Sequence, residues 1–320
     1  MTSNNTHPWW EDRMKCAADI IRDVEMNRKC ERTIVTPKTI YNYFDEHLFG
    51  CHEYKKAMAT AIWSSMERGT KTSFLVVGPS GCGKTELARL LKKKYYNTII
   101  FDATTVSPVS YKGNVTISQC LLEVDTSPNA LPAWIFIDEV DKALTKDDGL
   151  GEMIMNELLK MTEGGRIYAG PDDKNRTLVD TSRINFVFMG TFSTLTKERR
   201  KTYGFTADAS KASVNSPITR ETLYESSLFS NEFLGRINGG ILEVEAMDET
   251  KAEAMLSDER YSPVKRLEET YKVRIELSKE KRKELVRMTP RFGVRGIYSE
   301  LQGRINDALF EDCSIKTITI

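Results

Sequence analysis

The sequence has few of the features that mark secreted, membrane-spanning or zinc-binding proteins. It has six cysteines and three histidines among 320 residues, and no two cysteines have C-x-x-C spacing. The scattered cysteines therefore predict neither a zinc site nor a disulfide framework. No apolar run approaches the ~18 residues of a transmembrane helix, and the N-terminus has no signal-peptide core. We therefore expect a protein without a membrane segment, in a reduced, cytoplasmic compartment.

The sequence also lacks an excess of charge of either sign, with 46 Lys+Arg against 46 Asp+Glu. Nothing in this balance favours nucleic acid or an acidic membrane as a partner, although a local basic patch stays open. The residues are 40% hydrophobic and 29% charged, a globular composition. The length favours one large domain with a smaller one.

What the sequence does contain is a phosphate-binding motif. The apolar run 73–77 is followed by a G-x-x-x-x-G-K-T stretch and then by the helical pattern 86–94. Strand, motif and helix in this order indicate a P-loop rather than a glycine-rich turn that binds nothing. The backbone N–H groups and the helix N-terminus would hold phosphates, with Lys84 on the β- and γ-phosphates and Thr85 on Mg²⁺. The predicted ATP-binding residues are Gly78, Pro79, Ser80, Gly81, Cys82, Gly83, Lys84, Thr85 and Glu86.

Two further apolar runs end in polar residues. The run 134–137 precedes Asp138 and Glu139, and the run 184–189 precedes Gly190 and Thr191. Such runs fit strands that are buried on both faces. Asp138 would belong to the Mg²⁺ shell, and Glu139 would orient or deprotonate the attacking water. Because ligands bind beyond the carboxyl ends of parallel strands, Thr191 is expected beside the γ-phosphate as a polar sensor. The alternative for the two carboxylates is a solvated strand end.

The remaining pattern predicts a large α/β domain over residues 36–245 and a small, mostly helical domain over 246–320. Residues 1–35 form a predicted helical extension, whose Trp9 and Trp10 either anchor a partner or pack on the body of the protein. Residues 164–179 are expected to form a surface loop. Helices are expected at 38–45, 53–68, 117–123, 151–163 and from about 293, with strands at 98–102, 241–244, 273–277 and 315–320.

The order of these motifs resembles that of the AAA+ ATPases, and several segments resemble the ClpX type of protein unfoldase. The run Ile135 to Lys142 is similar to the Walker B run of ClpX, and residues 232–236, EFLGR, are similar to its arginine-finger box. Residues 293–296, GVRG, resemble its sensor 2 motif, and residues 36–50 resemble its segment around the adenine. The similarity covers roughly residues 35–318. The usual glutamine after Gly50 is Cys51 here, and the N-terminal zinc-binding domain of ClpX has no counterpart.

The resemblance implies a P-loop NTPase large domain, with a parallel sheet flanked by helices, followed by a helical lid domain. It adds Phe49 and Gly50 to the nucleotide site. It also implies that Arg236 acts as an arginine finger on the neighbouring subunit's γ-phosphate in a homo-oligomeric, hexameric ring, whereas Arg295 contacts phosphate in its own subunit. The alternatives are a surface salt bridge for Arg236 and a solvent-facing side chain for Arg295.

The resemblance further implies two loops that handle protein. Tyr111, Lys112 and Gly113 stand where ClpX has its central-pore loop, although Lys112 replaces a hydrophobic residue. Tyr111 is otherwise an ordinary loop tyrosine. Tyr203, Gly204 and Phe205 stand where Clp unfoldases dock a ClpP-like peptidase. A three-residue match leaves that partnership open.

The predicted function is therefore an ATP-dependent unfoldase that threads polypeptide substrates through a ring. Two alternatives remain open: a nucleic-acid motor or loader of the same superfamily, and a remodeller that acts on one dedicated partner without degradation. The neutral charge and the lack of a recognisable DNA-reading module disfavour the first alternative.

Overall fold

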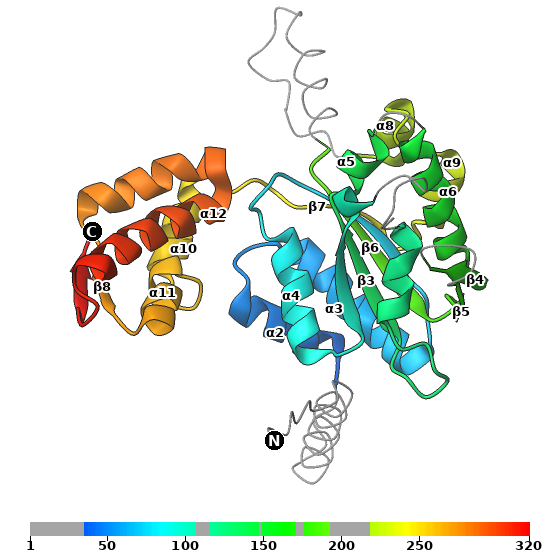
Figure 1. Ribbon diagram of the computed structural model, residues 1–320, viewed down its shortest axis with the longest axis horizontal. Helices are drawn as coiled ribbons and strands as arrows, with labels where there is room; N and C mark the ends of the chain where they lie inside the picture. The colour runs from blue at the N-terminus through cyan, green and yellow to red at the C-terminus, as the bar shows by residue number, and fades with distance from the viewer. Residues whose placement is uncertain (1–34, 107–115, 147–148, 171–175, 193–217) are drawn as a thin grey trace, which may run out of the picture.

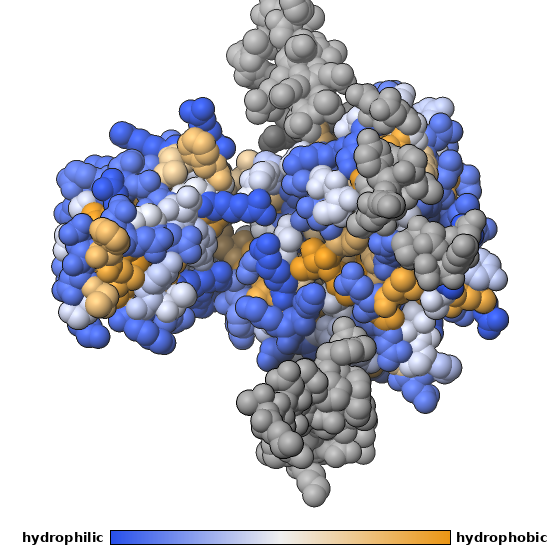
Figure 2. All heavy atoms as spheres, in the orientation of Figure 1, coloured by the Kyte–Doolittle hydropathy of each residue, from blue (hydrophilic) through white to orange (hydrophobic). Residues whose placement is uncertain are grey.

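The computed structural model describes residues 35–106, 116–146, 149–170, 176–192 and 218–320. Within these ranges the chain forms a larger α/β lobe, followed by a smaller lobe built mainly from helices (Figure 1). In the space-filling view, hydrophilic residues cover most of both lobes on the visible face (Figure 2). None of the described helices is both long and apolar enough to cross a membrane.

The larger lobe is centred on a five-stranded sheet in the order β2-β3-β6-β1-β7, in which every pair is parallel. Its strands are β1 (Ser73–Val77), β2 (Thr98–Asp102), β3 (Ala133–Asp138), β6 (Ile184–Gly190) and β7 (Gly240–Glu243).

Helices cover both faces of this sheet. One face carries α2 (Pro37–His47), α3 (His52–Arg68) and α4 (Lys84–Lys94); the other carries α5 (Val140–Leu144), α6 (Leu150–Glu163), α8 (Arg220–Glu225) and α9 (Asn231–Arg236), together with the 3-10 helices η1 (Ala103–Thr105) and η2 (Ile117–Glu123).

The continuous apolar runs are explained by this two-sided cover. Successive residues of a strand point to opposite faces. Accordingly, Leu75 and Val77 of β1 belong to the core on the α6 side, whereas Phe74 and Val76 belong to the core on the α4 side. The same alternation holds in β3 and β6. The predicted α/β fold with a buried parallel sheet is confirmed.

The smaller lobe has its own core. It contains α10 (Glu249–Ser257), α11 (Pro263–Tyr271) and α12 (Lys279–Glu311), with β8 (Arg274–Glu276) and β9 (Thr317–Thr319) paired in parallel. Its buried cluster runs from Ala252 to Ile318, whereas the clusters of the larger lobe end at Val244. The division of the chain at residues 245 and 246 stays a prediction.

The helix predicted at 117–123 is present as the 3-10 helix η2. Two local expectations are corrected. Residues 166–180 are not a plain surface loop, because β4 (Arg166–Ala169) pairs antiparallel with β5 (Thr177–Asp180). Helix α12 already begins at Lys279, although Gly293 has non-helical backbone angles and separates two helical halves. A propensity argument missed the hairpin because its strands expose most of their side chains.

Asn185 lies near the amino end of the central strand β6, on the side of the sheet away from the P-loop. Its side chain forms hydrogen bonds with residues of α3 and β3 and with the residue before β1. Its side chain is fully buried. The amide donates to the Ala133 carbonyl and the Ser65 hydroxyl, each at 3.0 Å, and accepts from the Thr72 N–H at 2.9 Å. This side chain therefore satisfies two buried polar groups, the Ala133 carbonyl and the Ser65 hydroxyl, and one partly buried N–H group, that of Thr72.

We expect Asn185→Ala to lower the free energy of unfolding by about 2–4 kcal/mol, because buried polar groups lose their partners. Asn238→Ala is the matched control. Its amide also joins two backbone groups, Ser73 N–H and Lys71 C=O, but the residue is exposed. Because the Asn238 side chain borders solvent, water can enter when it is removed, so the loss should be smaller, about 1 kcal/mol. Urea unfolding measures both, and equal losses would contradict the burial argument.

Candidate functional site

A cavity of about 540 Å³ lies between the two lobes at the carboxyl ends of β1, β3 and β6. This volume lies within the range of small-molecule sites. The larger lobe contributes the end of α2, the P-loop, the N-terminus of α4 and the ends of β3 and β6. The smaller lobe contributes Met247, Met255, Tyr261, Arg266 and one side of α12.

The P-loop bends where glycine permits it. Gly81 and Gly83 have φ values of 75° and 102°, which side chains rarely adopt. Gly83 then caps the N-terminus of α4, whose positive end favours anions. The Lys84 ammonium donates to the carbonyls of Gly78 and Pro79 at 2.6 and 2.8 Å. The loop thus presents backbone N–H groups and a lysine to the same cavity.

The predicted Mg²⁺ ligands are brought together. The Thr85 hydroxyl donates to Asp138 Oδ2 at 2.6 Å, although 53 residues separate them in the chain. A hydroxyl and one carboxylate beside a phosphate site fit Mg²⁺, which is usually held by few protein oxygens plus substrate phosphates. The described residues contain no group of three or more His, Cys, Asp or Glu suited to a metal ion. These residues therefore suit Mg²⁺ bound together with a nucleotide.

Glu139 and Thr191 line the same cavity from adjacent strands. Glu139 has φ 55° and ψ 33°, a left-handed conformation that costs a non-glycine residue about 1–3 kcal/mol. This turn leads the chain from β3 directly into α5. The Glu139 carboxylate accepts a hydrogen bond from the Lys142 ammonium at 2.8 Å. The arrangement places one carboxylate and one hydroxyl beyond neighbouring strand ends.

The smaller lobe touches the P-loop backbone to backbone. Gly293 has φ 63° and ψ −170°, and a Cβ built there would lie 2.9 Å from the Ser80 carbonyl oxygen. The Val294 N–H also donates to the Gly81 carbonyl at 3.5 Å. Glycine is therefore needed where the kink in α12 meets the phosphate loop. From this kink, Arg295 reaches the cavity wall.

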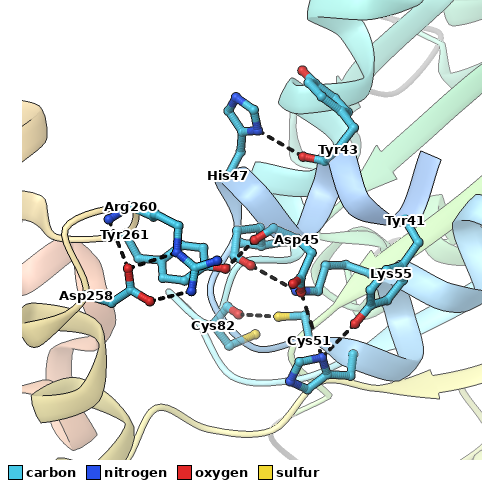
Figure 3. Close-up of polar contacts among 12 residues, drawn as sticks. Tyr41, Tyr43, Asp45, His47, Cys51, Lys55, Cys82, Asp258, Arg260 and Tyr261 are labelled. Atoms are coloured by element: carbon cyan, nitrogen blue, oxygen red, sulfur yellow. Dashed lines mark hydrogen bonds and ion pairs between the residues drawn. The ribbon is translucent and has the colours of Figure 1, made fainter. Parts of the chain in front are cut away.

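The rim beside α2 also joins the two lobes (Figure 3). The Tyr261 hydroxyl donates to the Asp45 carbonyl, and Arg266 donates to the His47 carbonyl at 2.6 Å. The Asp45 carboxylate accepts from the buried Lys55 ammonium at 2.5 Å. Burial alone would raise the pKa of Asp45, but the hydrogen bond and charge of Lys55 outweigh burial and hold that pKa below its usual value.

Two cysteines pack at this rim without acting as nucleophiles. The Cys51 thiol donates to the Cys82 carbonyl at 3.3 Å (Figure 3). Burial raises the pKa of Cys51 to about 12, and burial also raises the pKa of Cys82. Both side chains are therefore thiols at neutral pH, and the reactive species of cysteine is the thiolate.

Arg236 does not line the cavity. It ends α9 and donates to the Leu159 carbonyl and to Glu232. Lys71 lies close enough to feel its charge. Burial lowers the pKa of Lys71 to about 8, and the positive charge of Arg236 acts in the same direction. Within its own chain, Arg236 forms ion pairs with Glu232 and Glu163 and lies outside the cavity.

Most of the predicted site residues meet in the cavity. The lining includes Phe49, Ser80, Gly81, Cys82, Gly83, Lys84, Thr85, Glu86, Asp138, Glu139, Thr191 and Arg295. Pro79 and Gly50 lie next to lining residues in the chain, and the Gly78 and Pro79 carbonyls accept hydrogen bonds from the lining residue Lys84. Tyr111, Lys112, Gly113, Tyr203, Gly204 and Phe205 lie outside the described residues.

The sequence analysis missed several lining residues. Tyr298, Ser299 and Gln302 follow Arg295 at spacings of three, four and seven, so the helical period could have found them. Arg266 and Tyr261 had no such signal, because their contacts with α2 join segments more than two hundred residues apart.

Comparison with known proteins places this site in a family. The model of the AAA domain (Cdc48 subfamily) matches residues 69–239, more than half of the chain. The chain belongs to the AAA family. This AAA protein is similar to the ATP-dependent Clp protease ATP-binding subunit ClpX of Treponema denticola, with 28% identity over 88% of the chain and 79% of that protein.

Two other ClpX relatives give the same result. The Bacteroides fragilis subunit is 26% identical over 86% of the chain and 76% of its own length. The subunit named ClpX 2 of Wolinella succinogenes is 25% identical over 94% of the chain and 84% of its own length. The AAA protein is therefore a ClpX-like ATPase, and the cavity at its P-loop is the candidate site for the nucleotide.

The contact between α12 and the P-loop yields a test. In Gly293→Ala the new Cβ would meet the Ser80 carbonyl at a backbone angle that costs alanine about 1–3 kcal/mol. If the smaller lobe moves away to relieve this strain, ATP affinity should fall about tenfold. The measurement is equilibrium binding of a fluorescent ATP analogue.

Gly303→Ala is the matched control, because it lies on the same helix and a Cβ there has nothing within 4 Å. Its ATP affinity should match the wild type, and the helix should gain about 0.5–1 kcal/mol. Unchanged affinity in Gly293→Ala would show that the backbone contact does not support binding.

Proposed function

We propose that this AAA ATPase is a protein unfoldase. It assembles into a ring, hydrolyses ATP at the interfaces between subunits and threads polypeptide through the centre of the ring. The observation that carries this proposal is that the functional residues are divided between the two lobes, with one of them outside the cavity. Phosphate-binding elements lie on the larger lobe, Arg295 lies on the smaller lobe, and Arg236 lies outside the cavity of its own chain. Such a site is completed by an arginine from a neighbouring subunit.

Within one chain, the geometry of the cavity supports the following hydrolytic roles. Lys84 and the N-terminus of α4 bind the β- and γ-phosphates. Thr85 and Asp138 would hold Mg²⁺, which neutralises charge on the phosphate oxygens. Glu139 accepts a proton from the attacking water while the water oxygen forms a bond to the γ-phosphorus. The bond to the ADP oxygen then breaks, and the proton passes to the released phosphate.

Mechanical output would come from motion between the lobes. Arg295 lines the cavity from α12, where it would contact phosphate, and the same helix touches the P-loop at Gly293. A change at the γ-phosphate therefore alters the contacts that set the angle between the lobes. By resemblance to ClpX, that motion would move Tyr111, Lys112 and Gly113 along the pore, while Tyr203, Gly204 and Phe205 would dock a ClpP-like peptidase in the cytoplasm.

Glu139→Gln tests the hydrolytic role and the substrate class together. The amide cannot accept the proton, so kcat for ATP should fall at least a hundredfold, with ATP affinity within about threefold of wild type. Glu123→Gln is the control on an exposed glutamate and should retain full turnover. The ATP-loaded variant should retain a permanently unfolded protein in a pulldown. Retention of DNA, with ATPase stimulation of the wild type by DNA alone, would favour the nucleic-acid motor.

Arg236→Ala should abolish ATP hydrolysis and spare nucleotide affinity, because the side chain is outside its own cavity. An arginine finger contributes about 10³–10⁵ in kcat. Mixing this variant with Glu139→Gln chains should restore part of the ATPase rate, since some interfaces then pair a normal Glu139 with a normal Arg236. Arg304→Ala, which removes an exposed arginine of α12, is the control. An inactive mixture would argue against action between subunits.

A further inference from the structure

Asp141 holds the end of the sensor strand. It lies on α5, two residues after Glu139, and is 7% exposed. One carboxylate oxygen, Oδ2, accepts three hydrogen bonds: from the Thr191 N–H at 3.1 Å, the Thr191 hydroxyl at 3.0 Å and the Phe192 N–H at 2.8 Å. The other oxygen, Oδ1, is buried and has no hydrogen-bond partner.

The backbone at this strand end is shaped for the carboxylate. Phe192 has φ 48°, a left-handed conformation. Two successive N–H groups thereby converge on one point, as in the backbone nests that bind anions. Gly190 allows the close approach, because a Cβ there would lie 2.5 Å from Asp141 Oδ1. The strand end and Asp141 are thus fitted to each other.

This geometry fixes the direction of the Thr191 hydrogen bond. Asp141 Oδ2 accepts from two backbone N–H groups, so it carries no hydrogen itself. The Thr191 hydroxyl must therefore be the donor. Because the only hydrogen of the Thr191 hydroxyl is donated to Asp141, its oxygen can only accept hydrogen bonds from groups in the cavity. Glu139 beside it is also an acceptor when ionised.

Phosphate oxygens accept hydrogen bonds and do not donate them, whereas a water molecule has two O–H donors. An acceptor at Thr191 therefore suits water and not the γ-phosphate. We propose that Asp141 is a positioning residue, which holds the Thr191 hydroxyl as an acceptor for the second hydrogen of the attacking water. This inference rests on the proposed role of Thr191 in hydrolysis.

Thr191→Val removes the hydroxyl at nearly constant volume and tests the direction of the bond. We expect kcat to fall about tenfold to a hundredfold, as for a misplaced reactant. The ratio of ATP to ADP affinity, measured in the Glu139→Gln background, should change less than about threefold. A larger loss of ATP affinity relative to ADP would show that Thr191 donates to the γ-phosphate and would overturn the inference.

Asp141→Ala and Asp141→Asn test the positioning role. Alanine frees the Thr191 hydroxyl, so kcat should fall about as far as in Thr191→Val, with KM for ATP little changed. Asparagine keeps an acceptor oxygen and should restore most of the rate. In the Thr191→Val background neither substitution should lower kcat further, because residues that act through one group are not additive.

If alanine prevents folding, the asparagine variant alone decides. Its weaker acceptor should lower kcat a few-fold in the wild type and not at all in Thr191→Val. Equal losses in both backgrounds would overturn the positioning role and leave Thr191 in hydrolysis. An unchanged kcat in Thr191→Val would instead remove Thr191 from the proposed function.

Asp102→Asn is the matched control. Asp102 Oδ1 accepts from the Thr104 N–H at 2.9 Å and from the Thr104 hydroxyl at 2.6 Å, at the end of the neighbouring strand β2. It does not line the cavity. Because Asp102 is exposed, this variant should lose less stability than Asp141→Asn, and it should retain the basal ATPase rate. A kcat loss equal to that of Asp141→Asn would show that a purely structural effect explains both.

Discussion

The parallel pairing of β1, β6 and β3 is the constraint on which the site depends. In a parallel sheet the carboxyl ends of neighbouring strands lie at one edge. The register pairs Val77 with Gly190, and Ile137 with Phe188. The P-loop, Asp138 with Glu139, and Thr191 therefore meet although they are far apart in the chain. A one-residue slip would turn every apolar side chain to the opposite face, so core packing also fixes the geometry of the catalytic edge.

A second constraint is the backbone contact between Gly293 and the P-loop. Because no side chain separates the two lobes there, a small shift of α12 changes the wall of the cavity directly. The rim contacts of Tyr261 and Arg266 on α2 lie at another side of the same cavity. A nucleotide between these contacts touches both lobes. Its binding energy is therefore available to set their relative position.

The sequence predicted what is encoded locally. The P-loop follows from glycine spacing between a strand and a helix, and Asp138, Glu139 and Thr191 follow from apolar runs that end in polar residues. It did not predict the hairpin of β4 and β5, whose side chains are mostly exposed, nor the contact of Arg266 with His47, which depends on packing between lobes. Asp141 was visible in the Walker B run, yet its three bonds to Thr191 and Phe192 exist only once β3 and β6 pair.

The pairing of β3 and β6 also explains how the Asp141 carboxylate can be buried among mostly apolar residues. Asp141 is buried beside Phe192, but two backbone N–H groups and one hydroxyl compensate one of its oxygens. The second oxygen has no such compensation, at a cost of about 1–3 kcal/mol for a buried polar group. A buried polar atom without a hydrogen-bond partner is uncommon in folded proteins, so the arrangement at Asp141 needs an explanation. The one-sided arrangement is better explained by a fixed direction for the Thr191 hydroxyl, which needs a single acceptor on one side.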